Sequence, residues 1–324
     1  MHIAFAVMPP AETGGTGGTH YLAGLIPALR GLGHRVDVLD GDDVVLPPGA
    51  VPVIDGMRLP RLQDRADALA ESGASVLVHH ISAAAGRDAG AREAVRAAEA
   101  ALIPRMRRVI ATSATVAAQL RELFGVAADF VAPGAVDLPR NCASADPPLV
   151  LSVGVLTRRK GHDLLLRAMA RLTDLEWRLV IAGDSSREPA HAAELAALIE
   201  ELGLRHRATL LADPEPDALR RAWETAGLFA LATRWEGYAA GVAEALRRGI
   251  PVAVTEGGAS GELVPPEAGA VVNREDQPTF GKVLRRMIFD HALRAEMAEA
   301  AWEAGQRLPG WPEQAAKFAA LLEG

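Results

Sequence analysis

The sequence is poor in several residues and patterns on which particular protein classes depend. Its 324 residues include one cysteine, Cys142, which excludes an internal disulfide framework and a cysteine-based zinc site and fits a reducing cytosol. No apolar run approaches the roughly 18 residues that span a bilayer, and the first residues lack the charged start and long apolar region of a signal peptide. We therefore expect a cytoplasmic protein without an integral membrane segment.

Positive charge is scarce relative to negative charge. There are 34 Lys and Arg residues against 41 Asp and Glu residues, which gives a formal net charge of −7. This balance argues against nucleic acid or an anionic membrane surface as the main partner. A local cluster of cations is therefore more informative here than it would be in a basic protein.

Several catalytic signatures are also missing. No Gly-x-Ser-x-Gly elbow is present, so no motif supports a hydrolase with a serine nucleophile. His79 and His80 end an expected strand, but no His-Glu-x-x-His or cysteine cluster completes a zinc site around them. The acidic stretch at 40–43 follows an expected surface strand and is interpreted as a solvated loop. We expect neither a metal nor a cofactor.

What the chain does contain is a regular alternation of strands and helices, which predicts parallel sheets built from βαβ units. The length suits two domains of roughly 100–200 residues each. We expect strands at residues 2–7, 35–39, 51–54, 75–79, 108–111, 149–153, 177–182, 208–211, 228–231 and 251–255, and an end to the first βαβ unit near 129–133. Helices are expected at residues 21–30, 61–71, 91–103, 114–124, 162–172, 190–202, 217–224, 280–290, 291–307 and 313–322.

Two breaks in this alternation set the domain boundaries. Residues 138–148 lose all periodicity, and we place the inter-domain linker there. The prolines and glycine at 309–312 separate a last helix from the rest. We predict a first domain at 1–143, a second at 144–308, and a terminal helix at 309–324 that packs back on the first domain.

The most informative stretch is Trp235–Gly249, which carries two carboxylates eight positions apart. Glu236 lies in a glycine-containing loop, and Glu244 is expected in the opening turn of a short helix. A helix N-terminus can face an anion, and flanking carboxylates can accept hydrogen bonds from hydroxyls. A phosphate joined to a sugar meets both conditions, so the stretch predicts a nucleotide-sugar site.

A basic turn follows the first strand of the second domain. Arg158, Arg159 and Lys160 are adjacent there, at the carboxyl end of an expected parallel strand, where α/β proteins usually bind ligands. Arg grips phosphate oxygens through two N–H groups, and Lys supplies a point charge. A solvated basic turn is the alternative. In an acidic chain the phosphate-binding interpretation is at least as favourable.

Small and polar residues at other strand ends complete the candidate cleft. Gly154 and Gly183 permit close backbone approach to a ligand, and Asp213 follows the strand at 208–211. The Gly14–Gly18 loop follows the first strand and faces either a diphosphate or the second substrate; it matches neither a Rossmann fingerprint nor a P-loop. His79 can bond a substrate hydroxyl or take part in proton transfer, with a structural histidine pair as the alternative.

Together these motifs resemble glycosyltransferase family 4, the retaining, metal-independent enzymes of the GT-B fold. The resemblance covers nearly the whole chain and is strongest over 149–262. It implies that Glu236 contacts donor sugar hydroxyls and that Glu244 accepts hydrogen bonds from the nucleotide ribose. It further implies that Arg159 and Lys160 bind the donor diphosphate. His79, or His80 in its place, matches a histidine near the reacting sugar.

The resemblance implies an α/β protein with two Rossmann-like domains facing a cleft. Its activity would be transfer of a hexose from a nucleoside diphosphate sugar to a small-molecule or glycan acceptor held by the first domain, with retention of configuration. The expected catalytic residues are His79, Glu236, Arg159 and Lys160. The expected donor-binding residues are Gly17, Gly18, Gly154, Arg159, Lys160, Gly183, Asp213, Gly237, Tyr238, Ala239, Ala240 and Glu244.

Three positions depart from the family pattern. Val155, Ala135 and Ala239 replace residues that are more frequent in the family, and the Ala239 methyl is expected to narrow the donor pocket or reduce activity. These departures leave a catalytically silent binding or partner subunit as an alternative. A nucleotide-sugar epimerase of the same fold is a second alternative, against which the Glu-x7-Glu spacing argues.

Overall fold

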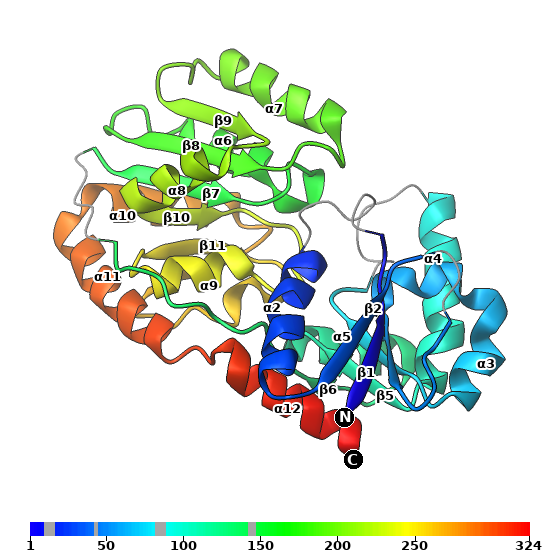
Figure 1. Ribbon diagram of the computed structural model, residues 1–324. Coiled ribbons are helices and arrows are strands. Elements are labelled where there is room, and N and C mark those ends of the chain that lie inside the picture. The colour runs from blue at the N-terminus through cyan, green and yellow to red at the C-terminus, as the bar shows by residue number, and fades with distance from the viewer. Residues whose placement is uncertain (10–16, 42–44, 82–88, 142–146) are drawn as a thin grey trace. The chain divides into compact units, whose positions relative to one another are not determined.

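The computed structural model describes residues 1–9, 17–41, 45–81, 89–141 and 147–324 (Figure 1). Of the positions considered above, Gly14, Gly15, Asp42, Asp43 and Cys142 lie outside the described residues. The chain forms two compact units. Unit 1 comprises Met1–Gly134 and Pro309–Gly324, and unit 2 comprises Ala135–Leu308.

Each unit is built on a six-stranded sheet whose paired strands are parallel, which confirms the α/β prediction. The strand order is β2-β1-β3-β4-β5-β6 in unit 1 and β12-β11-β10-β7-β8-β9 in unit 2. The second order is that of a Rossmann fold, because the chain starts in the middle, runs to one edge, and returns to fill the other half. The direction of winding changes between β7 and β10.

Unit 1 begins with β1, and its elements alternate as predicted. Its strands are β1 (His2–Ala6), β2 (Arg35–Leu39), β3 (Val51–Asp55), β4 (Ser75–Val78), β5 (Arg108–Ala111) and β6 (Asp129–Phe130). Its helices are α2 (Gly17–Gly31), α3 (Ala66–Glu71), α4 (Ala89–Leu102), α5 (Ala114–Phe124) and α12 (Trp311–Glu323). The helix predicted over 61–71 was wrong in its first half. Two 3₁₀ turns occupy 56–65, and Arg65, at φ −111° and ψ 16°, delays the α-helix to Ala66.

The C-terminal helix α12 packs in unit 1 against α2. Phe318 of α12 is fully buried and stacks on Phe5 of β1 with ring centroids 5.9 Å apart. A side chain at Gly24 of α2 would place its Cβ 2.0 Å from the ring of Trp311, so only glycine allows this close approach. The last helix is therefore part of the hydrophobic core of unit 1.

Unit 2 has the same alternation, with one strand that the sequence did not predict. Its strands are β7 (Leu149–Val153), β8 (Arg178–Gly183), β9 (Ala208–Ala212), β10 (Ala226–Leu231), β11 (Val252–Glu256) and β12 (Gly269–Asn273). Its helices are α6 (His162–Met169), α7 (Pro189–Glu201), α8 (Pro216–Thr225), α9 (Ala240–Arg247), α10 (Gln277–Phe289) and α11 (His291–Gln306). The missed strand, β12, follows two prolines and lies at the edge of the sheet.

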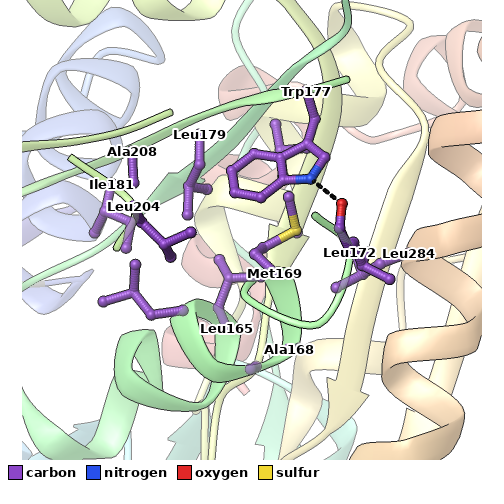
Figure 2. Packing of buried hydrophobic residues seen from close by; sticks show 14 of the residues in the cluster. Leu165, Ala168, Met169, Leu172, Trp177, Leu179, Ile181, Leu204, Ala208 and Leu284 are labelled. Atoms are coloured by element: carbon purple, nitrogen blue, oxygen red, sulfur yellow. Dashed lines mark hydrogen bonds between the residues drawn. The ribbon is translucent and has the colours of Figure 1, made fainter. Parts of the chain in front are cut away.

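The core of unit 2 closes around Trp177, which is 1% exposed. Figure 2 shows its indole among the side chains of Leu165, Met169 and Leu179. Its Nε1–H donates a hydrogen bond to the carbonyl of Leu172, 2.8 Å away. This bond holds the turn that ends α6 at Met169, three residues earlier than the sequence predicted. Within the described residues, no helix is both long and apolar enough to cross a bilayer.

Candidate functional site

The candidate site lies where the winding of the unit 2 sheet reverses. Strands β7 and β10 are paired there, and the loops that follow them leave the same edge of the sheet. Open parallel sheets bind ligands outside the carboxyl ends of their strands at such a point. The loop after β7 carries Arg159 and Lys160, and the loop after β10 carries Glu236.

Glu236 lies at the centre of this site and is 3% exposed. Its Oε1 lies 2.7 Å from the Nζ of Lys160 and 3.3 Å from an Nη of Arg159. The hydroxyl of Thr233 donates to the same oxygen over 3.1 Å. The structure thus brings three of the predicted residues together. Among the described residues, none donates a hydrogen bond to the second oxygen, Oε2.

The charges in this cluster stabilise one another. Burial by itself raises the pKa of Glu236, but the adjacent Lys160 and Arg159 charges outweigh it and hold the pKa below its ordinary value. Burial lowers the pKa of Lys160, and the charge of Glu236 opposes that shift. The carboxylate is therefore ionised and shared by two cations, which leaves one positive charge in excess.

A glycine loop after β11 fixes the backbone of Glu236. The Glu236 N–H donates to the carbonyl of Gly257 over 2.9 Å, and the Ala259 N–H donates to the carbonyl of Glu236 over 2.8 Å. Gly258 has φ +63°, and a Cβ there would lie 2.1 Å from the Glu236 carbonyl oxygen. Only glycine tolerates both the backbone conformation and the contact. The carboxylate is thereby placed by backbone bonds as well as by ion pairs.

The basic turn after β7 is attached to β10 in a similar way. Gly161 has φ +67°, and a Cβ there would lie 1.8 Å from the carbonyl oxygen of Ala232. The Arg234 N–H donates to the carbonyl of Arg159 over 2.9 Å. The three cations of the turn then separate, because Arg158 points away and pairs with the exposed Glu194 at 2.6 Å.

Arg159 retains unused donors. Its Nη1 donates to the Trp235 carbonyl over 2.6 Å and also makes the contact with Glu236. In the part of the chain that the structure describes, its Nη2 and Nε groups make no hydrogen bond. Arg159 is partly exposed, with 26% of its side-chain surface accessible. These groups can therefore receive a further acceptor without breaking the present contacts.

Two predicted glycines line this turn. A Cβ on Gly154 would lie 2.9 Å from the Cε of Lys160, and a Cβ on Gly183 would lie 1.9 Å from the Gly154 carbonyl oxygen. Because Gly154 has no side chain, the Lys160 side chain can pack against it, and because Gly183 has none, the Gly154 backbone can approach it closely. Both glycines thus have a structural role next to the cations.

His162 supports the same loop and was not singled out from the sequence. Its Nε2 lies 3.3 Å from the Gly154 carbonyl oxygen, and its Nδ1 lies 3.3 Å from the hydroxyl of Ser152. A carbonyl only accepts, so Nε2 carries the proton and Nδ1 accepts from Ser152. Burial, reinforced by the charge of Lys160, lowers the pKa of His162 to about 4. Its signal in the sequence was its place immediately after the basic turn, at the start of a helix.

The prediction that Glu244 lies in the opening turn of its helix was wrong. Helix α9 begins at Ala240, because Ala239 has the non-helical angles φ −90° and ψ 73°, and Glu244 falls in the second turn. Its Oε1 accepts hydrogen bonds from Arg248 over 2.9 and 3.1 Å. The Arg248 guanidinium in turn lies 5.5 Å over the ring of Trp223. Glu244 nonetheless remains 34% exposed.

The segment between the two carboxylates is mostly buried. Gly237 and Ala239 are buried, whereas Ala240 is exposed. The Ala239 methyl belongs to the hydrophobic cluster that contains Val242, and the residue is 2% exposed. The expectation that this methyl narrows a ligand pocket is therefore not supported, because it packs in the core. Burial, with the nearby charge of Glu262, raises the pKa of the Tyr238 hydroxyl.

Asp213 connects two loops at the same sheet edge. It has φ 51°, unusual for a residue with a side chain, and its N–H donates to the Gly183 carbonyl over 2.9 Å. Its carboxylate accepts hydrogen bonds from the backbone N–H and the hydroxyl of Ser185. In the structure Asp213 thus orders the loop after β8.

The remaining predicted residues lie in unit 1. Gly17 and Gly18 begin α2 rather than lying in the preceding loop. His79 follows β4 and is 7% exposed; a Cβ on Gly18 would lie 3.0 Å from its Cδ2, and Tyr21 packs edge-on at 5.3 Å. Gly18 leaves room for the His79 imidazole because it has no side chain.

Asp55 is an additional buried residue beside His79. Its Oδ1 lies 3.7 Å from the His79 Nε2, too far for a hydrogen bond, and within the described residues that nitrogen has no other partner. Burial lowers the pKa of His79 and raises that of Asp55, and the attraction between the two groups opposes both shifts. Asp55 is the last residue of β3, and His79 follows β4. The two side chains meet because these neighbouring parallel strands end at the same edge of the sheet.

Comparison with known proteins identifies the family. The model for glycosyl transferases group 1 matches residues 139–304, a range that contains Arg159, Lys160, Thr233 and Glu236. The chain belongs to this family. The match covers the unit whose sheet has the Rossmann strand order and carries the carboxylate with its two cations.

Curated relatives match mainly this same part. A D-inositol 3-phosphate glycosyltransferase of Xylanimonas cellulosilytica is 33% identical over 172 residues, which are 53% of this chain and 41% of the relative. D-inositol 3-phosphate glycosyltransferase 1 of Catenulispora acidiphila is 30% identical over 260 residues, or 73% of this chain and 62% of the relative. The chain thus spans about half the length of the curated relatives that it matches.

Solved structures resemble the whole chain. Sucrose-phosphate synthase from Thermosynechococcus elongatus has a TM-score of 0.79 at 21% identity and covers 100% of this chain and 98% of its own. HepE of Anabaena, solved in complex with UDP-glucose, has a TM-score of 0.77 at 18% identity and covers 99% of each chain. These likenesses confirm the predicted GT-B fold.

Proposed function

We propose that this protein transfers a sugar from a nucleoside diphosphate sugar to a small-molecule or glycan acceptor, and that the donor diphosphate binds at Arg159 and Lys160. The observation that carries the proposal is the contact of Lys160 and Arg159 with the single carboxylate of Glu236, at the point where the sheet reverses. The family and the UDP-glucose complex of HepE support it.

The charge balance suits a diphosphate. Two cations share one carboxylate, and the Nη2 and Nε groups of Arg159 are available to phosphate oxygens. When the bond to the sugar breaks, negative charge grows on the leaving diphosphate, and fixed cations stabilise it without reorganising. The partial burial of both cations strengthens this interaction relative to water. The reaction then needs no metal, which we include in the proposal.

The free oxygen of Glu236 suits the sugar. Its Oε1 is held by three donors, while Oε2 is left to accept a hydrogen bond from a hydroxyl. A carboxylate held by both backbone and side-chain bonds can fix one sugar orientation at little entropic cost. We assign Glu236 to the donor sugar.

The finer parts of the proposal follow the resemblance to glycosyltransferase family 4. They are retention at the anomeric carbon, contact of Glu244 with the nucleotide ribose, and a position for His79 near the acceptor. The 34% exposure of Glu244 is compatible with a ribose contact. Because the donor is a nucleoside diphosphate sugar, we place the reaction in the cytoplasm.

The test begins with calorimetric titration of UDP, GDP, ADP and TDP. Binding of one of them is expected, and failure of all four would contradict the proposal. The matching nucleotide sugars are then incubated with the protein, with and without EDTA, and the released nucleoside diphosphate and the anomeric configuration of the product are measured by NMR. We expect release, unchanged by EDTA, with retention.

Two other results would select the alternatives. Tight nucleotide binding without donor turnover favours a silent binding subunit, and an epimerised sugar, free or on the nucleotide, favours an epimerase. The burial of the Ala239 methyl removes one reason for expecting a silent protein.

A further inference from the structure

A basic surface hollow lies between helices α6 and α10 of unit 2 and has a volume of about 350 Å³. Its apolar lining comes chiefly from Leu164, Ala168, Leu172 and Pro278. Its polar lining is almost entirely cationic. The cations that line it are Arg167, Arg171, Lys282 and Arg285.

Three of these four cations have no ion pair among the described residues. Arg285 pairs with the exposed Asp174, with one N–O distance of 3.0 Å. In the part of the chain that the structure describes, neither Arg167, Arg171 nor Lys282 has a carboxylate within 4.0 Å. The whole protein carries a net charge of −7, so this concentration of positive charge is local. Like charges so arranged repel, and an anion between them relieves that repulsion.

A second hollow adjoins the first and shares Lys282 and Arg285 with it. It adds Asp174, Leu175, Arg286 and Phe289, and Phe289 is 71% exposed. Among the described residues Arg285 is paired with Asp174, whereas Lys282 and Arg286 have no ion pair. An exposed aromatic side chain next to these two cations offers contact to a ligand that has both an apolar and an anionic part.

The surface is held in place by the core beneath it. Ala168 and Leu172 belong to the hydrophobic cluster around Trp177, and the bond from Trp177 to the Leu172 carbonyl fixes the turn that carries Arg171 (Figure 2). Arg207 donates to the carbonyl of Leu175 over 2.6 Å, which restrains the next residues. On α10, a Cβ at Gly281 would meet nothing within 4 Å, so the hollow is open at that point. The cations that line the hollow therefore belong to helices α6 and α10 and to the turn after α6.

We propose that this hollow binds a phosphate group, or another compact anion, that is attached to an apolar body. The cations hold the anion, and Leu164 and Ala168 contact the apolar part. The exposed Phe289 extends this apolar contact from the adjoining hollow. Neither Lys160 nor Glu236 lines the hollow, so the site is separate from the donor site. A soluble organic phosphate and the headgroup of an anionic lipid share this chemistry.

The experiment uses the whole protein and two probes. Hexyl phosphate is titrated by calorimetry, with inorganic phosphate beside it, and co-sedimentation is measured with phosphatidylcholine vesicles that contain or lack phosphatidylglycerol. The variant is Arg167→Gln/Arg171→Gln/Lys282→Gln. The control is Arg178→Gln/Arg205→Gln/Arg221→Gln, which makes the same change in charge at exposed arginines outside the hollow.

We expect at least one probe to bind, and the first variant to weaken it by about tenfold or more while the control stays near wild type. Hexyl phosphate that binds better than inorganic phosphate identifies a soluble organic phosphate, and binding of phosphatidylglycerol vesicles alone identifies a lipid headgroup. Circular dichroism melting of both variants shows whether they fold. No binding of either probe, or equal binding by the two variants, would overturn the proposal.

Discussion

The Nζ of Lys160 lies 2.7 Å from the Oε1 of Glu236, although the two residues follow different strands. β7 and β10 are neighbours in the sheet, so their loops meet at one edge. The contact joins the cationic turn to the carboxylate loop and places both at the point where the winding reverses. The stability of the site and its proposed chemistry depend on the same pair.

The unfolding free energies of Lys160 and Glu236 variants should not be additive, because removal of Lys160 alone leaves a buried carboxylate with fewer partners. Lys160→Met leaves the buried Glu236 with Arg159 and Thr233 only, and we expect a loss of about 2 kcal/mol in unfolding free energy. In Lys160→Met/Glu236→Gln no buried carboxylate remains, so the double variant should be more stable than the sum of the single effects by about 1 kcal/mol. Urea unfolding of the wild type, Lys160→Met, Glu236→Gln and the double variant measures this coupling. Additive effects would show that the pair is not coupled.

His162 should make stability depend on pH. Its pKa is lowered from 6.5 to about 4 by burial, so below pH 6.5 the unfolded chain binds a proton that the folded protein does not. The stability contributed by the neutral imidazole is complete above pH 6.5 and is lost as the pH falls toward 4, by about 3 kcal/mol. His162→Gln cannot titrate. The wild-type advantage should therefore shrink over this range, and a constant difference would refute the assignment.

Gly258 should be intolerant of a side chain for a reason beyond its backbone angles. Gly258→Ala would place a Cβ 2.1 Å from the Glu236 carbonyl oxygen, whereas the matched change Gly203→Ala, at a similar φ of +69°, meets nothing within 4 Å. Both variants bear the cost of positive φ, about 1 kcal/mol. We expect Gly258→Ala to lose about 2 kcal/mol more, as measured by thermal unfolding. Equal losses would show that the loop moves freely away from Glu236.

Glu244 should matter more to binding than to folding. Its pair with Arg248 is partly exposed, and such pairs contribute about 1 kcal/mol or less. Glu244→Ala should therefore change the unfolding free energy by less than about 1 kcal/mol, yet weaken binding of the nucleoside diphosphate about tenfold through loss of the ribose contact. Thermal shift and calorimetry measure the two effects. Unchanged affinity would remove Glu244 from the site.

The sequence predicted the elements whose patterns are local. The alternation of buried strands with helices gave the parallel sheets, and β2, β5 and β7 begin and end where the pattern predicted. It failed where a local signal was absent or misleading. β12 is an edge strand that follows two prolines, and the residues before Ala66 have helical composition but form 3₁₀ turns around Pro60.

Only part of the candidate site was predicted, because its loops have local patterns but their contacts depend on the order of the strands. Arg159, Lys160 and Glu236 were found from their loops, but their convergence on one carboxylate oxygen depends on which strands are neighbours. His162 and Asp55 were missed because their partners, Gly154 and His79, are brought to them by the fold. Thr233 was missed because the sequence does not show that its buried hydroxyl faces Glu236. Glu244 was misplaced by one turn because Ala239 is not helical.

The most direct test of the central claim compares the three adjacent cations of the basic turn. Arg158→Met, Arg159→Met and Lys160→Met remove the same charge, but Arg158 pairs with Glu194 whereas the other two contact Glu236. Calorimetry measures the affinity of each variant for the nucleoside diphosphate that binds the wild type and for the corresponding nucleoside. We expect Arg159→Met and Lys160→Met to weaken diphosphate binding about tenfold or more, with nucleoside binding and the Arg158→Met variant near wild type. Equal loss in all three variants, or no loss in any, would contradict the account.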